Sequence, residues 1–292
     1  MPTVRATQPL IAPPRAAAPH AISPSQRAQV LRRHQVRILG EGKPPLLLCN
    51  GFGCSQHIWN YLLPTLMRTH QVICFDQVGA GESDLSAYDP AKYATLAGYA
   101  QDVVELCQVL DLRKAILVGH SAGAMIGLLA AVQAPQHFAK AVLLAASPCY
   151  VNEPGYYGGF ERADVLEVLA SMDRNYYSWA GQFADLLIGP GYASSVGEEL
   201  TSYFCQADSA IARQFARVAY LADSRASVPQ LRLPTLLVQC TDDMAVPAEV
   251  GEYLRAHLPQ AQLVTLAATG HCPHLSAPLE TLAAMQSFLH AA

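Results

Sequence analysis

From residue 34 onward, short apolar runs alternate with stretches that carry apolar residues at helical spacing. The runs have the length of buried strands, and turn-forming residues bound many of them. The expected strands cover residues 34–39, 45–49, 71–75, 115–118, 141–144, 236–240 and 263–266, and the main expected helices cover 59–67, 96–110 and 277–290. Strands that alternate with helices predict right-handed βαβ units, and hence an α/β fold with a mostly parallel sheet and helices on both faces.

The strand pattern stops between residues 147 and 229. Helical periodicity replaces it there, and aromatic residues are frequent. A helical insertion between two core strands predicts a cap over the carboxyl edge of the sheet, where open α/β sheets bind ligands. The expected organisation is therefore an α/β core at 31–146 and 230–292, a helical cap at 147–229, and a tail at 1–30.

The expected tail is rich in proline, alanine and arginine, and no acidic residue precedes Glu41. It has no continuous apolar segment of the kind found in secretory signals. Six prolines within residues 2–24 would break the amphipathic helix of a transit peptide. The composition therefore predicts a disordered segment over residues 1–30.

The overall composition limits the classes of function. The 292 residues are 51% hydrophobic and 14% charged, so a sizeable core can form. A net charge of −4 gives no basic field for nucleic acid, and no apolar run approaches membrane-spanning length. The eight cysteines form no C-x-x-C pair and no metal-ligand spacing, which indicates reduced thiols in a cytoplasmic protein without a metal.

The stretch Gly119–Gly123, with the sequence Gly-His-Ser-Ala-Gly, lies between the expected strand at 115–118 and an apolar stretch typical of a helix. A sharp strand-to-helix turn at this pattern pushes Ser121 out of the sheet toward a base. It also directs the N–H of Ala122 at the oxyanion that a serine attack creates. Ser121 is therefore the candidate nucleophile.

An acid and a base must follow the serine in the chain, each at the end of a strand. The loop after the strand 236–240 contains Asp242 and Asp243, and the Asp-x-x-Val-Pro spacing favours Asp243, with Asp242 as the alternative. The loop after the last strand offers His271 as the base, with His274 as the alternative. In this scheme the base takes the serine proton, and the acid orients the imidazole and stabilises its charged form.

The second oxyanion donor is expected in the glycine-rich loop after the strand 45–49. The backbone N–H of Phe52, within Asn50–Gly53, is the candidate. An oxyanion hole made by Phe52 and Ala122 would complete the machinery for attack on a carbonyl, and this chemistry needs no cofactor.

Several longer motifs extend beyond this catalytic pattern. They include the two stretches Ser-Pro-Cys-Tyr-Val-Asn and Gly-Gly-Phe-Glu. The full set is Gly51–Cys54, Trp59, the Asp-x-x-Gly-x-Gly-x-Ser-Asp pattern of 76–84, Gly119–Ser121, Ser147–Asn152, Gly158–Glu161, Asp243–Pro247 and Gly270–His274. On these motifs the chain resembles the α/β-hydrolase superfamily over residues 34–291. More narrowly, it resembles the bacterial RsbQ-type stress-signalling hydrolases and their plant relatives, the karrikin and strigolactone receptors.

The resemblance implies an α/β-hydrolase fold with a four-helix, V-shaped cap over a deep hydrophobic pocket. By motif position the implied lining of the pocket includes Phe52 together with Tyr150, Phe160, Trp179, Phe183, Tyr220 and Met244. The resemblance also implies slow hydrolysis of a small hydrophobic ligand, coupled to a stress-response (sigma factor) pathway. The implied protein partner is a PAS-domain phosphatase of the general stress response.

Three functions share this set of residues. The first is a ligand-sensing regulator that hydrolyses a small hydrophobic ester or lactone. The second is a metabolic carboxylesterase, in which turnover itself is the purpose. The third is cofactor-free haloperoxidase or C–C hydrolase chemistry with the same three residues. Dehalogenases and epoxide hydrolases need an aspartate nucleophile, and Ser121 stands at that position here.

Overall fold

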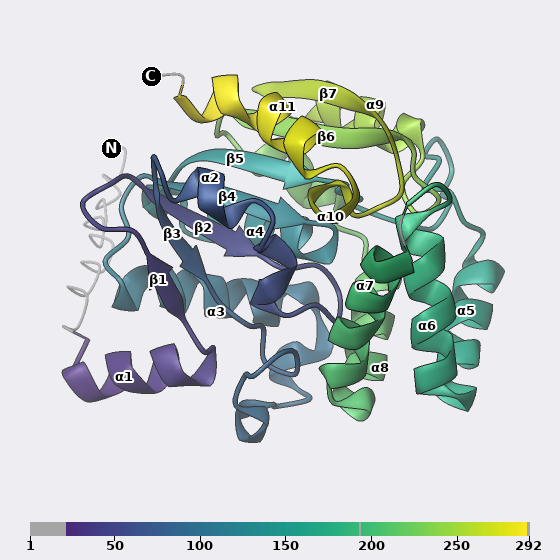
Figure 1. Cartoon of the computed structure of the whole chain (residues 1–292), viewed down its shortest axis with the longest axis horizontal. Coiled ribbons are helices and arrows are strands. Elements are labelled where there is room, and N and C mark those ends of the chain that lie inside the picture. Colours follow the sequence, from purple (N-terminus) through teal and green to yellow (C-terminus); the bar gives the residue numbers. More distant parts are fainter. Residues whose placement is uncertain (1–21, 193, 291–292) are drawn as a thin grey trace, which may run out of the picture.

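A seven-stranded sheet forms the centre of the protein, in a computed structural model that describes residues 22–192 and 194–290 (Figure 1). The strands are β1 (Arg37–Leu39), β2 (Pro45–Cys49), β3 (Gln71–Cys74), β4 (Ala115–His120), β5 (Phe138–Leu144), β6 (Thr235–Asp242) and β7 (Ala261–Thr269). Their order in the sheet is β1-β3-β2-β4-β5-β6-β7. Only the β1–β3 pair of these strands is antiparallel, so the predicted mostly parallel sheet is confirmed.

Helices cover both faces of the sheet, which buries the central strands (Figure 1). One layer contains α3 (Leu96–Val109), α4 (Ala122–Gln133) and α9 (Ala248–His257), and the other contains α2 (Leu63–Leu66), α10 (Pro273–Ser276) and α11 (Pro278–His290). All six residues of β4 are buried, as expected for a strand that is apolar on both sides. The 3₁₀ helices are η1 (Gln56–Trp59), η2 (Leu85–Ala87), η3 (Lys92–Ala94), η4 (Pro135–His137) and η5 (Arg225–Gln230).

The expected disorder is wrong for residues 24–30, because Pro24–Arg33 forms the helix α1. Ser23 and Gln26 make a reciprocal capping box, and Pro24 occupies the first turn, where its missing N–H costs nothing. The buried Val30 and an ion pair between Arg33 and Glu105 attach the helix to α3. The rest of the expected tail, residues 1–21, lies outside the described residues.

Two other element boundaries differ from the sequence expectation. The segment 59–67 is not one helix: η1 ends at Trp59 and the short α2 begins at Leu63, because Pro64 fits only the first turn of a helix. The first strand begins at Arg37 and not at residue 34, because His34 is the C-cap of α1.

Four helices lie between β5 and β6 and stand beside the carboxyl ends of the central strands (Figure 1). They are α5 (Arg162–Arg174), α6 (Tyr176–Ile188), α7 (Ser194–Gln206) and α8 (Ser209–Tyr220). Helix α6 packs against α5 and α7, and α5 also packs against α8. We call this four-helix unit the cap. The segments that enter and leave the cap are joined by an isolated antiparallel β-bridge between Cys149 and Asp223. A 2.7 Å hydrogen bond from the Ser224 N–H to the carbonyl of Pro148 also joins them.

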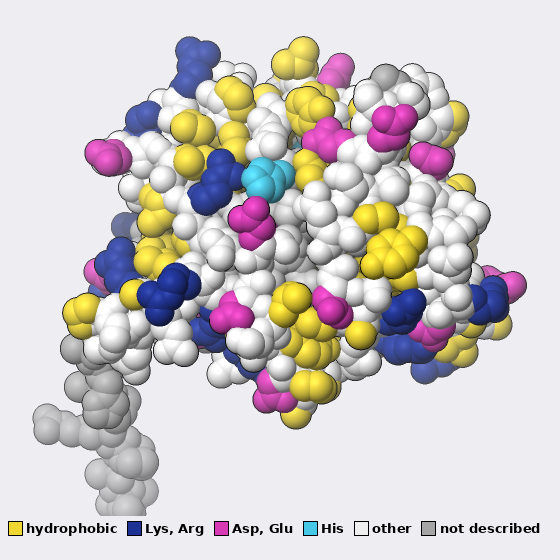
Figure 2. Space-filling view, turned by 60° about the horizontal axis from the view of Figure 1, so that its bottom comes forward, with side chains coloured by type: hydrophobic (Ala, Val, Ile, Leu, Met, Phe, Trp, Pro, Cys, Tyr) yellow, Lys and Arg dark blue, Asp and Glu magenta, His cyan; other side chains and the backbone are white. Residues whose placement is uncertain are grey.

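The small net charge is reflected at the surface, where acidic and basic side chains lie among one another on the face seen in Figure 2. All eight cysteines are free thiols, and seven of them are buried. Within residues 22–192 and 194–290, no helix has the length and apolarity needed to cross a membrane.

Candidate active site

Ser121 occupies the sharp turn between β4 and α4. Its φ of 53° and ψ of −123° lie outside the favoured backbone regions, a strain that is typical of functional positions. The neighbouring chain leaves no room for side chains at either glycine of the turn. A Cβ at Gly119 would lie 2.6 Å from the Cα of Ala124, and one at Gly123 would lie 2.2 Å from the carbonyl oxygen of Asn50. The two glycines therefore allow this turn to form.

A continuous chain of hydrogen bonds runs from Ser121 through His271 to Asp243. The Ser121 hydroxyl lies 2.7 Å from Nε2 of His271, and Nδ1 of His271 lies 2.9 Å from Oδ2 of Asp243. These side chains come from the end of β4 and from the loops after β7 and β6, so the sheet brings three distant segments together. Asp243 accepts from a neutral imidazole at Nδ1, which leaves Nε2 to accept the serine proton.

The two alternatives from the sequence lie outside this chain of hydrogen bonds. Asp242 is exposed and lines a surface groove next to the site. His274 is fully buried, and neither of its ring nitrogens has a hydrogen-bond partner among the described residues. The geometry thus favours Asp243 and His271 over both alternatives.

The surroundings of Asp243 keep its carboxyl ionised. Burial alone would raise its pKa, but the neighbouring His271 and three hydrogen bonds outweigh burial and lower the pKa below its usual value. Two of these bonds come from the backbone N–H groups of Ala245 and Val246, at 2.9 and 3.2 Å. A fixed negative charge at this place favours the imidazolium that forms when His271 takes a proton.

The two candidate oxyanion donors lie close to the serine: Ala122 follows it in the chain, and Phe52 lines the same cavity as Ser121. Ala122 is the first residue of α4, so its N–H has no partner within the helix. Phe52 lies in the loop after β2, and both residues are buried. Within the part of the chain that the structure describes, neither backbone N–H donates a hydrogen bond. Both are therefore available to a negatively charged oxygen.

Asn50 anchors the loop that carries Phe52, a role that the sequence analysis did not assign. Its Oδ1 accepts a 2.7 Å hydrogen bond from the indole N–H of Trp59, and its Nδ2 donates to the carbonyl of Phe75 at 2.8 Å. Gln77 donates to the Asn50 carbonyl at 3.0 Å. The partners are distant in sequence, so only the position of Asn50 directly before the loop could have indicated this role.

His120 supports the loop that carries His271. Burial, reinforced by the adjacent His271, lowers the pKa of His120 to about 3, so its ring is neutral near pH 7. Its Nε2 lies 2.9 Å from the carbonyl oxygen of His271, to which it donates. This contact fixes the backbone of the candidate base.

Two cavities follow one another above Ser121, and we call them the inner cavity and the antechamber. The inner cavity is about 20 Å³ and includes Ser121 and His271 in its wall. The antechamber is about 100 Å³ and almost wholly apolar. Three residues, Tyr150, Tyr220 and Ala245, line both and mark the boundary between them.

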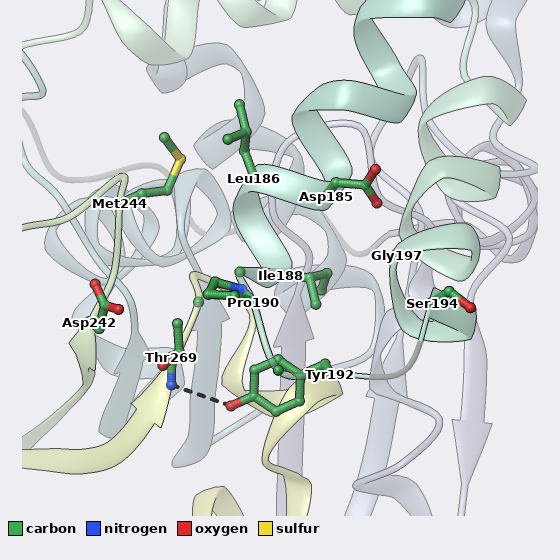
Figure 3. A pocket seen from close by; sticks show the side chains of 13 residues that line it. Asp185, Leu186, Ile188, Pro190, Tyr192, Ser194, Gly197, Asp242, Met244 and Thr269 are labelled. Carbon is green, nitrogen blue, oxygen red and sulfur yellow. Dashed lines mark hydrogen bonds between the residues drawn. The ribbon is translucent and has the colours of Figure 1, made fainter.

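A third cavity, the outer groove of about 450 Å³, lies between the end of α6 and the ends of β6 and β7 (Figure 3). It shares Leu186 and Met244 with the antechamber. Asp185 and Asp242 lie on different sides of this groove, and the Tyr192 hydroxyl accepts a hydrogen bond from the Thr269 backbone (Figure 3).

Most of the aromatic residues expected in the pocket line one of the first two cavities. Phe52, Tyr150 and Tyr220 line the inner cavity, and Tyr150 and Tyr220 together with Phe160, Phe183 and Met244 line the antechamber. Trp179 is not among the residues of these walls; it stacks on Phe183 with ring centroids 4.6 Å apart. Further lining residues of the inner cavity, not expected from the sequence, are Cys54, Leu187, Leu200, Phe204 and Cys272.

The α/β-hydrolase class is defined by a mostly parallel sheet with a serine on a strand-to-helix turn. An aspartate and a histidine follow this serine along the chain, each at the end of a later strand. The family model described as "Alpha/beta hydrolase family" matches residues 46–285. The chain therefore belongs to the alpha/beta hydrolase family, and the superfamily inferred from the motifs is confirmed.

The chain is similar to proteins named as esterases, receptors and hydrolases. A "probable esterase" of Oryza sativa subsp. japonica is 39% identical over 247 residues, which cover 84% of this chain and 91% of the rice protein. A "karrikin insensitive 2 receptor" of Petunia hybrida is 36% identical over 258 residues, covering 88% and 96%. Among solved structures, a hydrolase from Oleispira antarctica gives a TM-score of 0.89 at 34% identity, covering 91% of this chain and 98% of that one.

Proposed function

We propose that this protein is a serine hydrolase of small hydrophobic esters or lactones, with Ser121 as the nucleophile. The observation that carries the proposal is the hydrogen-bond chain from Ser121 through His271 to Asp243, which lies under an apolar cavity. A serine in this arrangement is activated for attack on a carbonyl. The apolar wall of the antechamber favours a hydrophobic substrate.

In the first half of the reaction, His271 takes the hydroxyl proton as Ser121 attacks the substrate carbonyl. The N–H groups of Phe52 and Ala122 stabilise the oxyanion, and His271 then gives its proton to the leaving alcohol. Water attacks the acyl-enzyme in the second half, with His271 again as the base. Asp243 holds the imidazole and its charge throughout.

A ligand-sensing role in the cytoplasm is the second part of the proposal. The petunia relative is named as a receptor, and a backbone hydrogen bond of 2.6 Å joins His271 to Leu187 of the cap. Occupancy or hydrolysis at Ser121 can therefore change the cap, and a partner protein can read that change. The partner proposed from the resemblance is a PAS-domain phosphatase of a stress-response pathway.

Hydrolysis of p-nitrophenyl acetate tests the enzymatic part. The unmodified protein is expected to turn over this ester, and Ser121→Ala is expected to lower kcat at least about 10⁴-fold while the far-UV circular dichroism stays unchanged. Full turnover by a folded Ser121→Ala protein would contradict the proposal.

Co-purification with the candidate phosphatase tests the sensing part separately. Substitutions on the exposed face of the cap, such as Tyr177→Ala, are expected to remove phosphatase binding without changing the esterase rate. If the phosphatase binds neither with nor without an ester substrate, a metabolic esterase remains as the function.

A further inference from the structure

The inner cavity has room for about one water molecule, since its volume is about 20 Å³ and one water needs about 10–15 Å³ on the same measure. Its wall includes three well-packed side chains: Cys54, Leu200 and Phe204 are at most 3% exposed. A Cβ at Gly53 would lie 2.9 Å from the Phe204 ring, so this ring is fixed against the loop that carries Phe52. The cavity therefore has little capacity to expand.

The antechamber opens in the other direction, toward the surface. Two of its lining residues, Leu186 and Met244, are 55% and 43% exposed, and both also line the outer groove. A substrate at Ser121 thus meets a small space with tightly packed walls on one side and a larger apolar path to solvent on the other.

The order of events in ester hydrolysis assigns the two sides. When the bond from Ser121 Oγ to the acyl carbon forms, the bond from that carbon to the alcohol oxygen breaks, and the alcohol leaves with the proton from His271. The acyl group stays on Ser121 until a water molecule attacks the acyl carbon and gives one proton to His271. The bond from that carbon to Oγ then breaks, and His271 passes the proton to Oγ. The alcohol must leave first, so it occupies the antechamber, and the acyl chain occupies the inner cavity.

We infer that the protein is selective for esters with a one- or two-carbon acyl group, formyl or acetyl, joined to a larger apolar alcohol. Leu200 and Phe204 of α7 set the limit on acyl length, because each further methylene would press against them. The inference rests on the proposed hydrolase function and names its substrate class. It makes these two cap residues determinants of specificity.

A series of p-nitrophenyl esters tests the inference, with formate, acetate, propionate and butyrate as substrates. Beyond acetate, kcat/KM is expected to fall at least about 10-fold for each added methylene. Leu200→Ala enlarges the inner cavity and is expected to raise the butyrate-to-acetate ratio of kcat/KM at least about 10-fold. Phe204→Leu is the second variant, in case one of the two does not fold.

Val196→Ala is the matched control, because Val196 lies on the same helix and is not among the lining residues of the inner cavity. It is expected to leave both the rates and the ranking of the esters unchanged. Equal kcat/KM for p-nitrophenyl butyrate and p-nitrophenyl acetate in a Ser121-dependent reaction would overturn the inference. An unchanged ranking of kcat/KM among the esters in folded Leu200→Ala and Phe204→Leu would overturn it as well. Cleavage of every ester without dependence on Ser121 would overturn the proposed function, and the inference with it.

Discussion

The backbone N–H of His271 donates a 2.6 Å hydrogen bond to the carbonyl of Leu187, in the last turn of α6. The candidate base is thus attached to the cap through the main chain and not through a side chain. Gly270 makes this approach possible, because a Cβ there would lie 2.2 Å from the carbonyl oxygen of Ile188. A displacement of α6 must therefore move the loop that holds His271.

Gly270→Ala is expected to lower kcat/KM for p-nitrophenyl acetate at least about 100-fold. The added methyl group meets the carbonyl oxygen of Ile188, pushes the histidine loop from α6, and displaces the imidazole from Ser121 by a fraction of an ångström or more. Steady-state kinetics measures this effect, and thermal unfolding reports any loss of stability at the same time.

Gly191→Ala provides the matched control for backbone strain. Gly191 has φ +92° and Gly270 has φ +97°, but a Cβ at Gly191 would have no atom within 4 Å. Both variants carry the strain of a left-handed residue, about 1–3 kcal/mol. Equal activity of the two variants would show that the contact with α6 does not position the base.

Asp243→Asn is expected to lower kcat about 10⁴-fold, because an amide can hold the imidazole in the wrong tautomer and carries no charge. Asp242→Asn is expected to change kcat less than about two-fold, since its side chain lies on the exposed outer groove. A comparison of the two by steady-state kinetics decides between the neighbouring aspartates. A larger loss in Asp242→Asn would reverse the assignment.

The sheet and the order of the three site residues could be predicted because their signals are local. The buried run of β4 and the Gly119–Gly123 turn lie next to each other in the sequence, and a serine on such a turn requires an acid and a base later in the chain. The loops that carry Asp243 and His271 each come directly after a strand. Parallel strands then place these loops at one edge of the sheet whatever lies between them.

The features that could not be predicted depend on contacts between distant segments. Composition favoured disorder for residues 24–30, but Pro24 occupies the first turn of α1, where it does not break the helix, and Arg33 and Glu105 dock α1 on α3. The division of the cavity above Ser121 depends on where Tyr150 and Tyr220 meet, 70 residues apart in the chain. The periodicity of the sequence does not predict a contact between two residues so far apart.

Trp59→Phe is expected to lower kcat about 10-fold with KM nearly unchanged. The variant removes the indole N–H that holds Oδ1 of Asn50 and leaves that buried oxygen unpaired, at a cost of about 1–3 kcal/mol in the free energy of unfolding. The loop that carries Phe52 then holds its N–H less firmly against the oxyanion. Kinetics and urea unfolding measure the two effects.

Tyr99→Phe is the control for Trp59→Phe. The Tyr99 hydroxyl is buried and has no hydrogen-bond partner among the described residues, so its removal takes away a polar group without breaking a bond. Its kcat is expected to stay the same, and its free energy of unfolding is expected to stay the same or to rise. If Trp59→Phe changes KM and leaves kcat at the value of Tyr99→Phe, Asn50 does not position the oxyanion donor.

The free energy of unfolding is expected to decrease as the pH falls, because His120 and His274 are buried in the neutral form next to the active site. Burial lowers the pKa of His120 to about 3 and that of His274 well below its ordinary value of 6.5. Below pH 6.5 the unfolded chain binds protons at both positions and the folded chain does not, so the free energy of unfolding decreases as the pH falls. Between about pH 7 and pH 5 the shift of His120 accounts for a loss of about 2 kcal/mol, and the shift of His274 adds a loss in the same direction.

His274→Phe isolates the share of one histidine in this acid sensitivity. The ring packs on Trp59 with centroids 4.8 Å apart and has no hydrogen bond to lose among the described residues, so a phenyl ring can replace it. Urea unfolding at pH 7 and pH 5 is expected to show a smaller loss of stability than in the unmodified protein. His257→Asn, at an exposed helical position, is expected to keep the full loss. An equal pH dependence in His274→Phe and the unmodified protein would mean that His274 takes up its proton in the folded state as readily as in the unfolded chain.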